Sequence, residues 1–402
     1  MSKISICLEY VWLDAKKNFR SKIKVWNIDT STSKFNGKNY DVLPEWTYDG
    51  SSTKQANGED SEIVLKPVAI FPKLAGHGYY VLCATYNLEP EIDDNGIQTW
   101  KYIQTESNTW HNANEIFEKY KDEKPWYGLE QEYFINPDRL GPDMLPNGLH
   151  KPDWRNMEEV QEGDVFMREL RQGQFYCSIG VKNCFYRKVA VEHMEECLKC
   201  GINISGINAE VAPNQWEFQV GPVEGINAAN QLLMARYLLI KLCEKKGFEC
   251  NFHPKPLFHY QQSLNGSGCH TNFSTENMRK EGGMTYIQNA CSRLEQEHKK
   301  HMENYGIDNE LRMSGECETA DFNTFSSGKA DRTSSVRIPL FVERDGYGYF
   351  EDRRPASNCD PYLVTSLILE TTCKDLTEKT IPQVNNVKMK IVPPLPLKLS
   401  LA

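Results

Sequence analysis

Residues 126–134 (WYGLEQEYF) form an aromatic and apolar segment that holds two carboxylates, Glu130 and Glu132. In an extended strand, residues two positions apart project from the same face, so both carboxylates would share one face. Two like charges in apolar surroundings are costly unless a cation lies beside them. The segment therefore predicts a β-strand with one face arranged to hold a metal ion.

The composition favours a soluble globular protein. The chain has 402 residues, 40% hydrophobic and 25% charged, which is enough for two domains and a large core. Its net charge is -9 and the basic residues are dispersed, which argues against nucleic acid as a partner. No run approaches the roughly 18 apolar residues of a membrane span, and the apolar start is too short for a signal peptide. We therefore expect a cytoplasmic protein with no membrane partner.

The 13 cysteines are odd in number and scattered, and several lie inside apolar stretches. This pattern favours reduced, buried thiols over a disulfide framework. Cys197 and Cys200 form a lone CxxC motif near a predicted helix end. Because no second pair is spaced for zinc, packing explains these two cysteines better than metal or redox chemistry.

The spacing of apolar residues and turn signals predicts an α+β protein. Apolar or alternating stretches at 4–13 and 21–27 indicate a small β-rich N-terminal unit. Residues 87–104 carry Pro, Asp, Asn and Gly with few aliphatics, which is typical of an exposed connection. We place the domain boundary there, with a first domain over 1–104 and a second over 105–402. Helical periodicity appears at about 185–200, 225–246, 276–305 and 360–375. Residues 138–172 and the tail 376–402 suggest irregular structure, and neither has a functional interpretation.

Residues 208–220 add two more carboxylates. The end of this segment reads as a strand with Trp216 and Phe218 on one face and Glu217 on the other. Glu210 lies across a Pro-Asn turn signal, so it would converge on Glu217 if the chain folds back there. On spacing alone, surface salt bridges explain the two carboxylates as well as metal ligation does.

A glycine-rich loop beginning at Asn265 passes into a strand in which His270, Asn272 and Ser274 share one face. The glycines would let the backbone approach a small ligand closely. The alternative is an ordinary turn beside a core histidine, which is the commoner arrangement.

Arginines are concentrated in two later segments. Residues 331–338 contain Arg332 and Arg337, and residues 349–355 contain Glu351 with Arg353 and Arg354. Guanidinium groups suit carboxylate and phosphate recognition, although ordinary ion pairing explains such a pattern equally well. Five carboxylates and one imidazole favour Mg²⁺ or Mn²⁺, with two or more cations at a phosphate site. The residues alone thus indicate a metal-dependent enzyme that uses ATP.

Taken in order, these segments closely resemble the glutamine synthetase family of the eukaryotic type. The similarity spans roughly residues 4–375 and rests on several motifs. These are residues 46–53 (WTYDGSST), the Glu-Gln-Glu motif, residues 208–222, residues 265–274 (NGSGCHTNFS) and residues 350–361 (FEDRRPASNCDP). The resemblance implies a β-grasp-like N-terminal domain and a larger catalytic domain built around a curved antiparallel sheet. It also implies a homo-oligomer, a decamer of two stacked pentameric rings.

The resemblance also implies roles for matching residues. The cation beside glutamate would be held by Glu132, Glu210 and Glu217. The cation beside the ATP phosphates would be held by Glu130, His270 and Glu351. The amino acid or its developing phosphate would be bound by Asn265, Gly266, Arg312, Arg337 and Arg353. The nucleotide would be contacted by Asn272, Ser274, Arg279 and Arg332, the last of which stabilises the γ-phosphoryl group.

Two further positions match catalytic residues of the family, in addition to Arg332. Asp49 matches the residue that reaches across a subunit interface and helps to deprotonate ammonium. Glu318 matches the flap residue that closes over glutamate. The implied reaction is ATP-dependent ligation of ammonia to the γ-carboxylate of L-glutamate through γ-glutamyl phosphate, which gives glutamine, ADP and phosphate.

The chain departs from the family pattern at three places. Cys317 stands where the family has histidine next to the flap carboxylate, and Asp331 stands where asparagine is usual. Residues 257–264 form a longer connection of different sequence. These departures motivate one rival hypothesis, a ligase that joins glutamate to another amine. A second rival is a catalytically silent structural or regulatory paralogue, against which the intact ligand positions argue.

Overall fold

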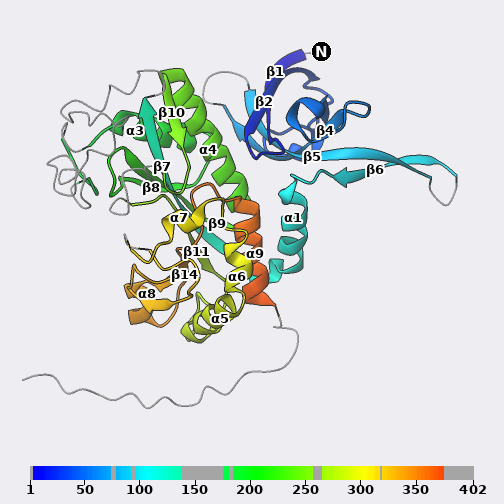
Figure 1. Cartoon of the computed structure of the whole chain (residues 1–402). Helices are drawn as coiled ribbons and strands as arrows, with labels where there is room; N and C mark the ends of the chain where they lie inside the picture. Colours follow the sequence, from blue (N-terminus) through cyan, green and yellow to red (C-terminus); the bar gives the residue numbers. More distant parts are fainter. Residues whose placement is uncertain are drawn as a thin grey trace, which may run out of the picture.

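The computed structural model describes residues 3–73, 78–92, 96–137, 175–180, 184–256, 265–316 and 319–374. The described residues form two sheets, one from residues 3–104 and one from residues 126–352, with helices packed beside the larger sheet (Figure 1). The predicted α+β class is confirmed. The division at residues 104 and 105 stays a prediction, and the segments 138–172 and 376–402 lie outside the described residues.

The N-terminal sheet has six strands. They are β1 (Lys3–Leu13), β2 (Phe19–Asp29), β3 (Trp46–Asp49), β4 (Glu62–Pro72), β5 (Gly78–Ile92) and β6 (Gln98–Gln104). The order is β2-β1-β5-β4-β3, with β6 paired to β5, and only the β1 and β5 pair is parallel. Alternating residues give the sheet two apolar faces: Leu8 and Tyr10 belong to its own small core, whereas Val11 and Leu82 join the main core. The described residues also form three short 3-10 helices. They are η1 (Tyr40–Val42), η2 (Ser51–Thr53) and η3 (Lys121–Glu123).

Residues 87–104 were predicted to form an exposed connection; the described ones are largely exposed, but they form paired strands and not a loop. The end of β5 pairs with β6 in an antiparallel ribbon that projects from the body, as Figure 1 shows. The ribbon is exposed, as expected, but its strand-forming residues Trp100 and Tyr102 pair with Pro90 and Leu88 across it. The polar and turn-forming residues of this segment obscured its strand-forming residues in the sequence.

The larger sheet has eight strands. They are β7 (Trp126–Pro137), β8 (Ile204–Ala209), β9 (Gln215–Glu224), β10 (Phe248–Asn251), β11 (Cys269–Ser274), β12 (Ser327–Lys329), β13 (Val336–Ile338) and β14 (Phe350–Asp352). The order is β12-β13-β14-β11-β7-β9-β8, with β10 paired to β7. All these pairs except that of β12 and β13 are antiparallel. The segment of residues 126–134 therefore lies at the centre of the sheet, as the strand prediction requires.

The helices are α1 (Thr109–Lys119), α3 (Arg187–Lys199), α4 (Asn227–Lys246), α5 (Met284–Gln296), α6 (His298–Met302), α7 (Asn309–Arg312), α8 (Leu340–Asp345) and α9 (Pro361–Cys373). Three of the four predicted helices are confirmed as α3, α4 and α9, and the fourth is divided into α5 and α6 with turns before it. Asp360 caps α9, because its Oδ1 accepts a hydrogen bond from the main-chain N–H of Tyr362 at 3.0 Å. Gly247 ends α4 with a φ of 71°, a conformation that favours glycine.

Helix α4 supports the face of the large sheet that lies opposite the polar residues described below. It contacts β7, β9, β10 and α9, and most of its side chains are buried in the main core. Among the described helices, none has the length and apolar character that crossing a bilayer requires. The described cysteines are free thiols, and both Cys197 and Cys200 are buried.

Candidate active site

Strand β7 directs its two glutamates to one face and the intervening Gln131 to the other, because successive side chains of a strand alternate. The strand register then adds partners from both neighbouring strands. His270 of β11 lies opposite Glu130, and Glu217 of β9 lies opposite Glu132. Directly opposed residues on one face are close neighbours, so the sheet itself brings these four side chains together.

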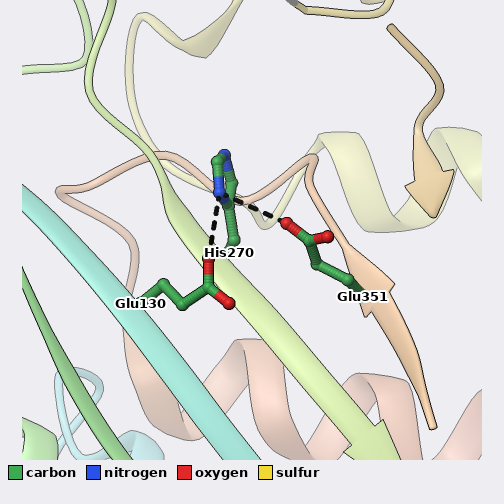
Figure 2. Close-up of side chains that lie close together, drawn as sticks. All are labelled: Glu130, His270 and Glu351. Carbon is green, nitrogen blue, oxygen red and sulfur yellow. Dashed lines mark ion pairs between the residues drawn. The ribbon is translucent and has the colours of Figure 1, made fainter. Parts of the chain in front are cut away.

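Two groups of side chains could each hold a cation, and the potential ligand atoms of each group lie within 4.8 Å of one another. The first group is Glu130, His270 and Glu351, which point toward one another from β7, β11 and β14 (Figure 2). The Nδ1 atom of His270 lies 3.6 Å from Oε2 of Glu130 and 3.5 Å from Oε1 of Glu351. This is the ligand set that the sequence predicted for the phosphate-side cation.

The second group is Glu132, Glu217 and His270. Its histidine nitrogen is Nε2, 3.9 Å from Oε1 of Glu132. A neutral imidazole has only one nitrogen lone pair, so His270 would bind a cation in one group and not in both. The five residues of the two groups, Glu130, Glu132, Glu217, His270 and Glu351, are called the acidic cluster below.

Glu210, the third ligand predicted for the glutamate-side cation, lies outside both groups. It is buried, lines the same cavity, and accepts hydrogen bonds from Asn208 Nδ2 at 2.7 Å and from the N–H of Val211 at 3.1 Å. Its charge nevertheless contributes to raising the pKa values of Glu132 and Glu217. Glu210 therefore lines the wall of the cavity beside the cluster without belonging to either group.

Two carboxylates of the acidic cluster, Glu132 and Glu217, are costly to ionise where they lie. Burial, together with the charge of Glu210, raises the pKa of Glu132 to about 8, and burial with neighbouring carboxylates raises that of Glu217 above its usual value. Burial and nearby arginines hold the pKa of His270 well below its usual value, which keeps the imidazole neutral and able to bind a metal. Oxygen-rich ligands of this kind fit Mg²⁺ or Mn²⁺.

Three of the predicted arginines surround this cluster. Arg337 and Arg353 both donate to the carboxylate of Glu351, the latter from Nη1 at 2.8 Å. Arg312 is buried, and its Nε and Nη2 atoms donate to Asn309 Oδ1 at 3.0 Å and to the carbonyl oxygen of Arg354 at 2.7 Å. Burial lowers the pKa of Arg312 to about 10. Part of the Arg312 guanidinium thus holds the chain after β14 in place.

These side chains line a polar cavity of about 400 Å³. Eleven predicted residues line it, namely Glu130, Glu132, Glu210, Glu217, Asn265, Gly266, His270, Arg312, Arg332, Arg337 and Arg353. The cavity also contains Gln219, which strand alternation places on the polar face with Glu217 but to which the sequence assigned no role. Sequence reasoning missed four others, which are Tyr176, Asn208, Thr319 and Ala330.

A second, more apolar cavity of about 410 Å³ adjoins the first, because Glu130 and Gln219 line both. The predicted nucleotide contacts Asn272, Ser274 and Arg279 lie here. Arg279 donates from Nη1 to Oγ of Ser274 at 2.9 Å, and its guanidinium lies 4.2 Å from the ring centroid of Trp126. Trp126 and Tyr349 form aromatic walls that the sequence did not identify, since aromatic residues in strands usually belong to the core.

Of the remaining two predicted residues, only Asp49 belongs to the described part of the chain, and it lies apart from the site. Asp49 is exposed on β3 and lines neither cavity. Its carboxylate accepts hydrogen bonds from Ser51 Oγ at 2.6 Å and Ser52 Oγ at 2.8 Å, which lower its pKa to about 2. Glu318 and its neighbour Cys317 lie outside the described residues.

The fold and the two cavities define a class: α+β proteins with a carboxylate and imidazole cluster in an antiparallel sheet, edged by arginines. A family model described as "Glutamine synthetase, catalytic domain" matches residues 112–295. The chain is 48% identical over 376 residues to the "Putative glutamine synthetase" of Acanthamoeba polyphaga mimivirus, covering 93% of this chain and 95% of the relative. It is 45% identical over 370 residues to the "Glutamine synthetase" of Saccharomyces cerevisiae, covering 92% and 89%. The chain belongs to the glutamine synthetase family.

A solved structure supports the fold. The chain is similar to the structure titled "CryoEM Plasmodium falciparum glutamine synthetase", with a TM-score of 0.66 over 94% of this chain and 73% of that chain. The sequence identity is 16%, so this similarity supports the architecture and carries no argument about individual residues. The family named from sequence motifs is confirmed by these comparisons.

Proposed function

We propose that this protein is a metal-dependent glutamate–ammonia ligase that makes glutamine from L-glutamate, ammonium and ATP through γ-glutamyl phosphate. Family membership supports glutamine synthesis in general. The observation that carries the finer proposal is the meeting of the two cavities at Glu130, which would place a nucleotide's phosphates beside the acidic cluster and the arginines. An acceptor carboxylate in the polar cavity would then lie next to the phosphoryl group that it attacks.

The acidic cluster fits divalent cations such as Mg²⁺ or Mn²⁺. Glu130, His270 and Glu351 would hold the cation on the phosphate side, and Glu132 and Glu217, with Glu210 at the wall, would hold the one on the glutamate side. Bound cations would neutralise charge on the phosphates during transfer. The family chemistry and the raised pKa values of Glu132 and Glu217 support this assignment.

The protein's own groups would bind and orient the substrates. Asn265 and Gly266 would position the amino acid, and Arg337 and Arg353 would bind glutamate or its developing phosphate through forked N–H donors. Arg332 lines the polar cavity and would stabilise the γ-phosphoryl group. Closure of a flap at Glu318 would exclude water from the acyl phosphate, which otherwise hydrolyses.

Asp49 would act in a neighbouring subunit of a homo-oligomer, a decamer in the family pattern. Its exposure on β3 and its absence from both cavities of its own chain support this role. The test is to mix Asp49→Ala chains with Glu351→Ala chains. Recovery of part of the activity is expected if sites form between subunits, whereas no recovery after proven co-assembly would contradict the shared site. A cytoplasmic location also stays a proposal.

The direct test is phosphate release from ATP with Mg²⁺ and glutamate, with and without ammonium, while the amino-acid product is identified by mass. Ammonium-dependent release with glutamine as the product is expected. Glutamate-dependent release without glutamine would favour a ligase for another amine, which Cys317 and the altered 257–264 segment motivate, and methylamine or polyamines would then be tried. The absence of release, together with failure to bind Mn²⁺ and ATP, would favour a silent paralogue.

A further inference from the structure

Arg236 of α4 is buried on the face of β7 opposite the acidic cluster, with 6% of its surface exposed. Its Nε donates to Oε1 of Gln131 at 2.7 Å, its Nη1 to the carbonyl of Cys359 at 2.7 Å, and its Nη2 to the carbonyl of Ser357 at 2.9 Å. These three acceptors are neutral, a fourth is Sγ of Cys359 at 3.7 Å from Nη2, and among the described residues no carboxylate forms a salt bridge with this guanidinium. A buried charge without a counter-ion needs an explanation beyond packing.

The contacts of Arg236 lead back to the acidic cluster through Gln131. This residue lies between Glu130 and Glu132 in β7 and is completely buried. Its Nε2 donates to the carbonyl of Glu132 at 2.8 Å and to the carbonyl of Ser357 at 3.0 Å. Arg236 and Gln131 therefore join the centre of β7 to the segment that follows β14.

A second set of contacts approaches Glu132 from the other side. The N–H of Ser357 donates to the carbonyl of Ser267 at 3.1 Å, in the glycine-rich segment before β11. The N–H of Gly268 then donates to Oε2 of Glu132 at 2.8 Å, and the N–H of Glu132 donates to the carbonyl of Gly268 at 3.0 Å. The contacts form a closed ring from Arg236 through Gln131, Glu132, Gly268, Ser267 and Ser357 back to Arg236.

We propose that Arg236 and Gln131 are positioning residues that fix the Glu132 carboxylate for cation binding by locking β7 to the chain after β14. A planar guanidinium donates from three nitrogens in fixed directions, whereas the three donors of an ammonium group sit on a single rotatable nitrogen. Groups behind a metal ligand orient it, and their loss typically weakens metal binding by about 10–100-fold. This inference rests on the proposed function, because it assigns a role at the same metal centre.

The experiment measures the Mn²⁺ dissociation constant by electron paramagnetic resonance of free Mn²⁺, and the thermal midpoint, for the full chain and its variants. Arg236→Met and Gln131→Met are each expected to raise the dissociation constant by about 10-fold or more in the folded protein. Arg236→Lys, which keeps the charge but loses the fork, is expected to weaken binding as well. The control is Arg293→Met, since Arg293 of α5 also donates to a main-chain carbonyl, that of Thr372, away from both cavities.

The double variant Gln131→Met with Arg236→Met separates positioning from stability. Gln131→Met removes the buried Oε1 that Arg236→Met leaves without its donor, while the carbonyl of Cys359 lacks its donor in both variants, so the thermal midpoint is expected to be no lower than that of Arg236→Met. The Mn²⁺ affinity is expected to stay low, because the Met side chains no longer join Ser357 and Cys359 to β7. Recovery of both quantities, or normal Mn²⁺ affinity in the folded single variants, would overturn the inference while leaving the proposed function intact. A parent protein that binds no Mn²⁺ would overturn the proposed function itself.

Discussion

Glu351 and Asp352 are neighbours at the end of β14, both are completely buried, and they enter opposite environments. Glu351 belongs to the acidic cluster, in which four carboxylates surround one imidazole, and it accepts hydrogen bonds from Arg337 and Arg353. Asp352 faces a network of Arg354, Tyr305, His301 and His298, which is called the inner network below. Arg354 donates to Asp352 from Nε at 2.8 Å and from Nη2 at 2.7 Å, and Tyr305 Oη donates to Oδ2 at 2.8 Å.

The pKa shifts of the two regions differ in sign. Burial alone would raise the pKa of Asp352, but the charge and hydrogen bonds of Arg354 lower it by more. The pKa of Asp352 therefore lies below its usual value. In the acidic cluster, burial and the like charge of Glu210 both raise the pKa of Glu132. A buried carboxylate paired with its own guanidinium, as Asp352 is, serves the structure, whereas Glu132 and Glu217, whose pKa values neighbouring carboxylates raise, favour an added cation. The comparison supports the proposed cation site at the acidic cluster and favours a structural role for the inner network.

The largest expected effect concerns the inner network. Asp352→Asn leaves the buried guanidinium of Arg354 without its counter-ion, so the free energy of unfolding is expected to fall by about 3–5 kcal/mol. Urea unfolding followed by circular dichroism measures this change. Asp345→Asn, which breaks the exposed ion pair with Arg344, is the control and should leave the unfolding midpoint unchanged. Equal effects of the two variants would remove the distinction between the inner network and a surface ion pair.

The acidic cluster is expected to respond in the opposite direction. Glu217→Gln removes a predicted ligand and one of several repelling charges, so Mn²⁺ affinity should fall by about 100-fold or more. The thermal midpoint of the metal-free protein should rise, because the repulsion of Glu217 by Glu130, Glu132 and Glu210 is removed. Glu249→Gln, on the exposed surface of β10, is the control for both measurements. A lower midpoint in metal-free Glu217→Gln would show that this carboxylate serves the structure.

The sequence predicted residues of the acidic cluster but did not predict the inner network. Alternation along β7 and β9 correctly placed Glu130, Glu132 and Glu217 on polar faces. It could not give the register that sets Glu132 opposite Glu217, because strand period alone leaves pairing between distant segments open. Likewise, the dense charge of residues 349–355 suggested a site but not its division, in which Glu351 and Arg353 reach the cluster while Asp352 and Arg354 enter the inner network.

Other parts of the fold show where local sequence patterns are sufficient to predict an element and where they are not. Helix α9 was predicted because an Asp-Pro pair supplies an N-cap and a first-turn residue, both of which act locally. The ribbon of β5 and β6 was missed because its turn-forming residues outweighed its strand-forming ones. Arg236 gave no signal, since an arginine in a helical pattern usually faces solvent and only the packing of α4 against β7 buries it.

A smaller effect is the pH dependence of the metal-free acidic cluster. The pKa of Glu132 is about 8 in the folded state against a usual value of 4.5, so the folded chain binds more protons between these values. Its contribution to stability is therefore lost as pH rises through this window, by at most about 1.4 kcal/mol per pH unit for one group. Thermal melts between about pH 6 and pH 8 should show a falling midpoint, which saturating Mn²⁺ abolishes by holding the carboxylates deprotonated. A midpoint that is independent of pH without Mn²⁺ would contradict the raised pKa.

The inner network should give the opposite slope. Burial, with a further contribution from Arg354, lowers the pKa of His301 from 6.5 to about 3, so the unfolded chain binds more protons between these values. The stability that depends on neutral His301 is present above pH 6.5 and is lost as pH falls toward the folded pKa. His301→Gln should reduce the fall of the thermal midpoint at acid pH, which is called the acid limb. His111→Gln in α1 should leave the acid limb unchanged. Because the alkaline limb depends on carboxylates and the acid limb on imidazole, Mn²⁺ should remove only the former. Loss of both limbs on adding Mn²⁺ would mean that the two regions titrate as one unit and that the contrast between Glu351 and Asp352 does not hold.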